Sequence, residues 1–169
     1  MGRAFEELCE YSYSELLYLA EGVYDKLVDA VGFDKVLDIL CVVSALDNFV
    51  NPMEHKIITD LLNDRSGLDA FVRLVNSYNT NYMIESTKSF IKSQPSWVRD
   101  YVSHIMICIC AAKKYMSKIE QNFIAEIAWK KQVWEFSHLY CYALAISINI
   151  LVTISISSKH ANSYGPWQL

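Results

Sequence analysis

The chain has 169 residues, which is the size of one ordinary domain and enough to bury a hydrophobic core. Hydrophobic residues make up 53% and charged residues 20%, a composition that excludes intrinsic disorder. The net charge is −4 and no basic stripe is present, which argues against nucleic acid as the partner.

The first predicted helices lie within residues 3–31, where apolar side chains recur at helical spacing. The polar run Tyr11–Ser14 divides this region in two, and either Ser12 or Ser14 is expected to cap the second helix. Gly32 then fits a C-terminal glycine cap, and Asp34 is expected to cap the helix that follows.

That next helix, residues 35–46, is apolar nearly all round and is therefore predicted to be buried. Residues 98–112 are equally apolar and are expected to be its packing partner. Between them, a break at Ser66–Gly67 precedes two shorter amphipathic helices, predicted at 68–78 and 82–92, and Ser93–Ser96 starts the next helix.

A segment of the chain occurs twice at a constant offset. Residues 42–62 (VVSALDNFVNPMEHKIITDLL) match residues 108–128 (CICAAKKYMSKIEQNFIAEIA), and both copies contain a capping-box pattern, Asn51…Glu54 and Ser117…Glu120. Repeated helix–turn–helix units constrain a whole architecture. The sequence predicts an all-α bundle of about seven or eight helices with an internal pseudo-twofold repeat, whose units are 34–64 and 98–130. We expect one domain over 1–158 and a tail over 159–169.

The C-terminal region is rich in aromatic residues and then free of charge. A helix is predicted at 132–147, and residues 139–158 are uncharged over a length that would span a bilayer. Their serine, threonine and asparagine content favours a buried core helix over a membrane anchor. The nearby aromatic side chains suit plain core, a membrane interface, a ligand cavity or a partner-binding surface, and the candidate partner-binding residues are Trp129, Trp134, Phe136 and Tyr140.

No motif nominates a reaction. The four histidines lie outside known ligand spacings, and His104 is interpreted as a hydrogen-bonded structural residue. The five cysteines are interpreted as reduced, mostly buried thiols, which predicts a cytoplasmic protein. Lys113, Lys114 and Lys118 form a short run typical of a solvated helix face. The chain is therefore predicted not to be an enzyme.

Two acidic residues lie at the turn inside the first repeat. Asp47 ends one helix and Glu54 opens the next, so a helical hairpin would bring them together as oxygen ligands for Ca²⁺ or Mg²⁺. The alternative, which we favour, makes Glu54 a capping residue and Asp47 a solvated loop residue. In the second repeat Glu120 matches Glu54, whereas Lys113 stands at the position of Asp47.

This repeated motif resembles that of the TerB-like family, named for tellurite-resistance proteins, which includes the N-terminal domain of DjlA-type co-chaperones. The family motif is roughly Ala-x-x-Asp-Gly-x-apolar-x-x-x-Glu, and here it corresponds to Ala45–Glu54 and Ala111–Glu120. The resemblance implies a non-enzymatic all-α module linked to metal-ion stress, membrane-associated complexes or phage defence. It also implies a divalent-metal site at Asp47, Glu54 and Glu120, with Lys113 replacing an expected acid.

The resulting functional expectation is a TerB-like binding module linked to a divalent metal and to a stress or defence response. It would have no certain cofactor beyond a Ca²⁺ or Mg²⁺ ion, a protein partner and, as one alternative, a homodimeric state. A second expectation is a protein-interaction or inhibitor module, related to phage or defence, that uses the aromatic C-terminal helix. A third is a small membrane-anchored protein with residues 139–158 as its anchor.

Overall fold

The described part of the chain is built from helices. A computed structural model describes residues 2–47, 51–62 and 80–128, and within these ranges it contains seven helices and no strand. The all-α prediction is confirmed for them. The helices are α1 (Gly2–Glu10), α2 (Tyr13–Val31), α3 (Phe33–Ala45), α4 (Pro52–Leu62), α6 (Thr80–Ser93), α7 (Ser96–Ala112) and α8 (Lys118–Ile127).

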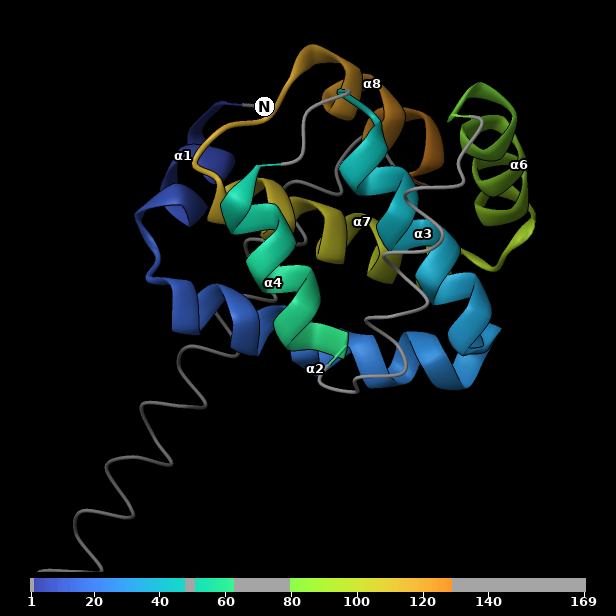
Figure 1. Ribbon diagram of the computed structural model, residues 1–169, viewed down its shortest axis with the longest axis horizontal. Coiled ribbons are helices and arrows are strands. Elements are labelled where there is room, and N and C mark those ends of the chain that lie inside the picture. Colours follow the sequence, from blue (N-terminus) through green and yellow to red (C-terminus); the bar gives the residue numbers. More distant parts are fainter. Residues whose placement is uncertain (1, 48–50, 63–79, 129–169) are drawn as a thin grey trace, which may run out of the picture.

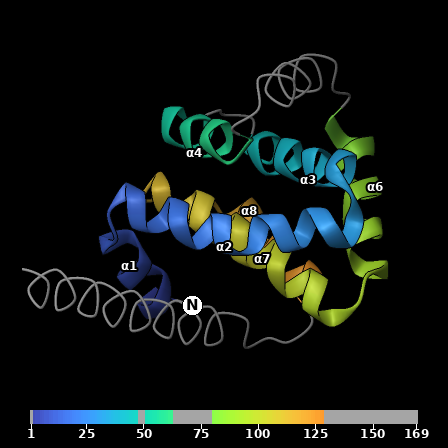
Figure 2. The ribbon, with the colours of Figure 1, turned by 90° about the horizontal axis from the view of Figure 1, so that it is seen from below.

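The helices form layers around one shared hydrophobic core (Figures 1 and 2). Figure 2 shows α3 and α4 in one layer and α2 with α7 in the neighbouring layer. Helix α6 lies across one end of these layers, and α1 lies at the opposite end. Helix α8 packs against α6 and α7.

The boundaries of α2 follow from its capping residues. Ser12 is the N-cap, and with Glu15 it forms a complete capping box in which each side chain accepts a hydrogen bond from the other residue's backbone N–H. Gly32 separates α2 from α3 at a φ of +85°, a conformation that glycine adopts readily. The prediction that Asp34 caps the next helix is wrong, because α3 already begins at Phe33 and Asp34 lies in its first turn.

The two most apolar segments are both buried, as predicted, but they are not each other's main partner. Helix α7 is buried along most of its length and packs chiefly against α2, whereas its contact with α3 is minor. Helix α3 instead packs against α2 and α6. The expected pairing of 35–46 with 98–112 is therefore wrong, because α2 supplies the apolar surface that α7 covers.

Helix α6 confirms the helix predicted at 82–92 and extends it slightly at both ends. The predicted helices at 68–78 and 132–147, the segment 139–158 and the tail 159–169 lie outside the described residues. None of the described helices combines the length and the apolar character needed to span a bilayer.

Candidate functional site: a lysine enclosed by three carboxylates

The first turns of α4 and α8 bring two glutamates into the interior. At α8, Glu120 Oε2 accepts a hydrogen bond from Ser117 N at 2.7 Å, and Ser117 Oγ accepts one from Glu120 N at 3.2 Å, which completes a capping box. At α4, Glu54 Oε2 accepts from Asn51 N at 3.2 Å, and the Asn51 side chain accepts from Met53 N at 2.8 Å. Both glutamates are therefore capping residues, as the favoured interpretation predicted.

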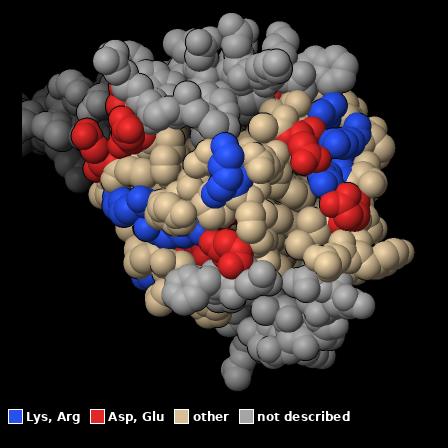
Figure 3. All heavy atoms as spheres, turned by 90° about the horizontal axis from the view of Figure 1, so that it is seen from above, with Lys and Arg blue, Asp and Glu red and all other residues tan. Residues whose placement is uncertain are grey.

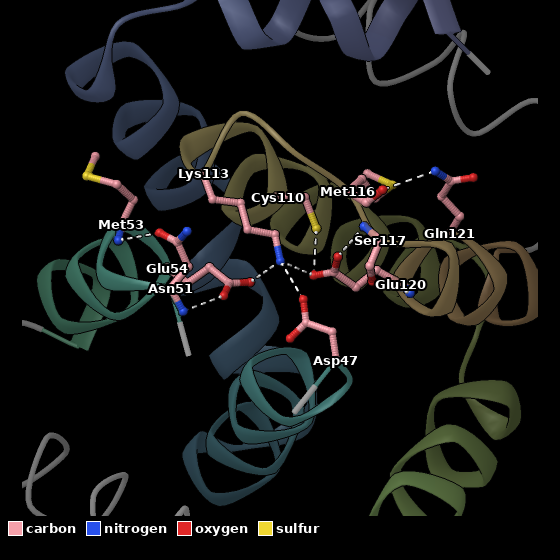
Figure 4. Close-up of polar contacts among 10 residues, drawn as sticks. All are labelled: Asp47, Asn51, Met53, Glu54, Cys110, Lys113, Met116, Ser117, Glu120 and Gln121. Carbon is pink, nitrogen blue, oxygen red and sulfur yellow. Dashed lines mark hydrogen bonds and ion pairs between the residues drawn. The ribbon is translucent and has the colours of Figure 1, made fainter. Parts of the chain in front are cut away.

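The same two glutamates also contact a lysine. The Lys113 ammonium lies 2.8 Å from Glu120 Oε1, 3.0 Å from Glu54 Oε1 and 3.1 Å from Asp47 Oδ2 (Figure 4). Lys113 directly follows α7, Asp47 lies in the turn after α3, and the glutamates open α4 and α8. We call these four side chains the Lys113 cluster. It joins the ends of four helices at one point.

The Lys113 cluster is almost completely shielded from solvent. The Lys113 side chain is 3% exposed, both glutamates are 0% exposed, and Asp47 is 16% exposed. Asp47 and Glu120 accept hydrogen bonds from the ammonium. Glu54 Oε1 makes a charge contact without the direction of a hydrogen bond, and no described residue donates one to it. Glu54 Oε1 is thus a buried carboxylate oxygen that has an ion-pair contact but no hydrogen-bond donor.

Burial and the contacts between opposite charges shift the pKa values of Lys113 and Glu54. Burial alone would lower the pKa of Lys113, but the contacts with Glu120 and Glu54 outweigh it and raise that pKa above its ordinary value. Burial raises the pKa of Glu54, and the nearby Lys113 offsets only part of this effect. The ammonium is therefore held in its charged form, and Glu54 is the carboxylate for which ionisation is penalised.

A buried thiol completes the surroundings of Glu120. Cys110 Sγ donates a hydrogen bond to Glu120 Oε1 at 3.3 Å. Burial, reinforced by the charge of Glu120, raises the pKa of Cys110 well above its ordinary value. Because the thiolate is the reactive form of cysteine, this thiol is unreactive where it stands.

The fold therefore brings Asp47, Glu54 and Glu120 together, as the metal-site hypothesis required, but around a cation that belongs to the chain. A calcium or magnesium ion needs six or more oxygen ligands, and here the ammonium stands between the three carboxylates. Within residues 2–47, 51–62 and 80–128, no group of three or more His, Cys, Asp or Glu side chains is arranged to hold a metal ion. With Lys113 in place, the residues do not fit a divalent ion.

Two sequence interpretations need correction. Asp47 is not a solvated loop residue, because it is half-buried and paired with Lys113. Lys113 does not belong to a solvated face, because its side chain is buried, whereas Lys114 is exposed and donates to the backbone carbonyl oxygens of Cys9 and Tyr11. The signal that could have revealed Lys113 was its opposite charge at the position matching Asp47.

The remaining sequence candidates divide into confirmed residues and residues outside the described ranges. His104 is buried in α7 with Nε2 3.3 Å from the carbonyl oxygen of Leu19, which confirms a hydrogen-bonded structural role. Cys9, Cys41, Cys108 and Cys110 are free thiols, and the last three are buried. The proposed partner-binding residues lie outside the described residues: Trp129, Trp134, Phe136 and Tyr140.

No protein-family model matches the chain, and no curated protein or solved structure matches it either.

Proposed function

We propose that this chain is a non-enzymatic, TerB-like helical module that acts by binding a protein partner. In this proposal the Lys113 cluster replaces a metal ion and holds two repeated units together. The main support for this proposal is that all three carboxylates point at and contact the ammonium of Lys113, a cation of the same chain. Because that cation is covalently attached, the module would keep its shape without a dissociable ion.

The repeated units are supported by matching positions in the two segments. Asn51 and Ser117 both precede a helix whose third residue is a buried glutamate, and in both cases that glutamate accepts the hydrogen bond of the preceding cap residue's N–H. We infer that the units are related by an internal pseudo-twofold repeat and belong to one domain. The Lys113 cluster would then lie where the units meet.

Binding rather than catalysis is supported by how the described buried polar groups are used. The carboxylates contact Lys113, Cys110 donates to Glu120, and His104 contacts a backbone carbonyl. On the face in Figure 3, positive and negative side chains are interspersed over a largely uncharged surface. The large apolar side chains exposed on the described helices and turns are Tyr18, Met53, Tyr82, Trp97, Tyr115 and Ile119. Such side chains are available for contact with another protein.

The test of the internal cation is a pair of melting curves, one in chelator and one in excess Ca²⁺ or Mg²⁺. For the natural sequence we expect the same melting temperature in both. For Lys113→Ala we expect lower stability in chelator and a rise of several degrees on adding the ion, because the carboxylates then lack a cation. A rise of several degrees in the natural sequence would contradict the proposal and favour the divalent-metal function.

The proposal that the chain binds a protein partner is tested by affinity capture with the full chain. We expect a specific protein to be retained, and we expect Trp129→Ala with Trp134→Ala to reduce its retention. Glu21→Ala, which changes an exposed side chain of α2 outside the set of exposed apolar residues, is the control and should retain the partner. Failure to retain any protein under conditions where the chain is folded would count against a binding module.

A further inference from the structure

Helix α1 packs on the core through apolar side chains, and a lysine of the turn after α7 also binds its C-terminal end. Leu8 is buried against the core, whereas Phe5 and Cys9 are only partly covered. Lys114, from the turn after α7, donates its ammonium hydrogens to the carbonyl oxygen of Cys9 and, at 2.9 Å, to that of Tyr11. These carbonyls lie at the C-terminal end of α1, where a lysine side chain can satisfy unpaired acceptors.

The backbone of Lys114 has a conformation that is usually left to glycine. Its φ is +61°. Lys114 N donates to Ala111 O at 3.0 Å, and Tyr115 N donates to Cys110 O at 3.3 Å, which is the hydrogen-bond pattern of a Schellman motif. The left-handed residue of that motif is disfavoured for any side chain with a Cβ atom. While the backbone has this conformation, the Lys114 side chain reaches the end of α1.

Lys113 and Lys114 are neighbours that are anchored on different parts of the molecule. Lys113 reaches Asp47 in the turn after α3 and the glutamates of α4 and α8, as Figure 4 shows, while Lys114 reaches the end of α1. They share one rigid peptide bond, so a rotation that relaxes the Lys114 backbone leaves Lys113 at the end of α7 and redirects the residues that follow Lys114. The turn also leads within three residues to Ser117, the cap of α8.

We propose that α1 is a displaceable strap whose attachment is coupled, through Lys114, to the buried Lys113 cluster. Displacing α1 from the turn lets Lys114 leave its left-handed conformation and loosens the cluster. Perturbing the cluster loosens α1 by the same factor, because coupling between two sites is reciprocal.

Amide hydrogen exchange on the full chain, followed residue by residue by NMR, tests the coupling. We expect Lys114→Met, which removes the ammonium but keeps a Cβ atom, to accelerate exchange at least tenfold both in the C-terminal half of α1 and at Ser117 and Glu120. Lys114→Gly should accelerate exchange in α1 while the cap of α8 stays protected, because glycine tolerates the left-handed conformation. Lys118→Met is the matched control, since it removes an exposed lysine from the same region and should change neither.

The reverse direction uses Asp47, whose carboxylate pairs with the Lys113 ammonium. Asp47→Asn weakens the cluster and should accelerate amide exchange in α1. Ile91→Val, a core change in α6, is the control and should not accelerate exchange in α1 more than in the other helices. Unchanged exchange in α1 for Lys114→Met would show that Lys114 does not hold the strap. In Lys114→Met, faster exchange in α1 with an unchanged α8 cap would show that the strap and the cluster are independent, and so would an unaffected α1 in Asp47→Asn. Either result overturns the proposal.

Discussion

Asp47 and Lys113 are 66 residues apart, occupy matching positions in the two similar segments of the sequence, and form a partly buried ion pair of 3.1 Å. The first contributes a negative charge and the second a positive one at the same place in the motif. A position that would carry two acids in two identical copies thus carries a complementary pair. The opposite charges at these two positions attract each other where two acids would repel.

This pair explains why three carboxylates can be buried together. Like charges at such distances would repel one another strongly in an interior of low dielectric constant. The ammonium at 2.8 to 3.1 Å from each of them compensates part of the charge, and the cap N–H groups of Asn51 and Ser117 solvate the other oxygens of the glutamates. The cluster therefore links local helix capping to the packing of helices that are distant in sequence.

The first prediction concerns Lys113→Met, which keeps most of the side-chain volume and removes the charge. It leaves three buried carboxylates without their cation, and breaking a buried ion pair in this way costs about 3–5 kcal/mol. We expect the free energy of unfolding to fall by about that amount near neutral pH, as measured by urea denaturation. Lys118→Met, at an exposed lysine, should cost much less. Equal effects of the two variants would contradict the role given to Lys113.

The second prediction exchanges the two charges. Lys113→Asp alone would place a fourth carboxylate in the cluster and should destabilise the chain more than Lys113→Met. If the two segments are structurally equivalent, adding Asp47→Lys returns an ammonium to the centre, so the double variant should recover most of the lost stability. The measurement is a double-mutant cycle on the free energy of unfolding. Additive losses in the cycle would mean that positions 47 and 113 are not interchangeable and would argue against the internal repeat.

The helices could be predicted because their signals are local. The apolar spacing and the caps at Ser12, Gly32 and Ser117 are properties of a few consecutive residues, and they predicted helices where α2, α3, α6, α7 and α8 are found. The extra cap assigned to Asp34 failed because the glycine before it already ends one helix and permits the next to start at once. Such boundaries depend on one or two backbone angles, which composition does not specify.

The partners within the site could be predicted only in part, because they depend on tertiary packing. The capping pattern indicated Glu54 and Glu120 but carried no information on which cation they face. The pairing of α7 with α2 rather than α3 is decided by which apolar surfaces are complementary in three dimensions. The left-handed conformation of Lys114 carried no sequence signal, since lysine rarely adopts it.

The third prediction concerns the pH dependence of Glu54→Gln. Burial raises the pKa of Glu54 in the folded chain above its ordinary value of 4.5. The stability that this shift contributes is fully present below pH 4.5 and is lost as the pH rises through the raised pKa. Glutamine cannot ionise, so the stability of the variant relative to the natural sequence should increase with pH above that value. Urea denaturation between pH 4 and 8 measures the difference.

Glu15→Gln is the matched control for Glu54→Gln, because the pKa of Glu15 is shifted in the opposite direction. The hydrogen bonds from Ser12 lower it below 4.5, so the ionised form stabilises the fold at neutral pH and this contribution is lost as the pH falls. The two variants should therefore show pH slopes of opposite sign. Parallel slopes would mean that the pKa of Glu54 is not raised.

The fourth prediction concerns acid unfolding through His104. Burial against α2 lowers the pKa of this imidazole from 6.5 to about 4. Below pH 6.5 His104 binds a proton in the unfolded chain but not in the folded chain. The free energy of unfolding is therefore highest above pH 6.5 and falls as the pH decreases towards 4. A shift of this size corresponds to about 3 kcal/mol lost over the interval. In His104→Gln, which keeps a hydrogen-bonding group without a basic nitrogen, this part of the acid dependence should disappear, and chemical denaturation at pH 7 and pH 4.5 measures it.

If both proteins lose the same stability between these two pH values, His104 is not the group that opposes protonation, and the α2–α7 interface tolerates a charge at its centre.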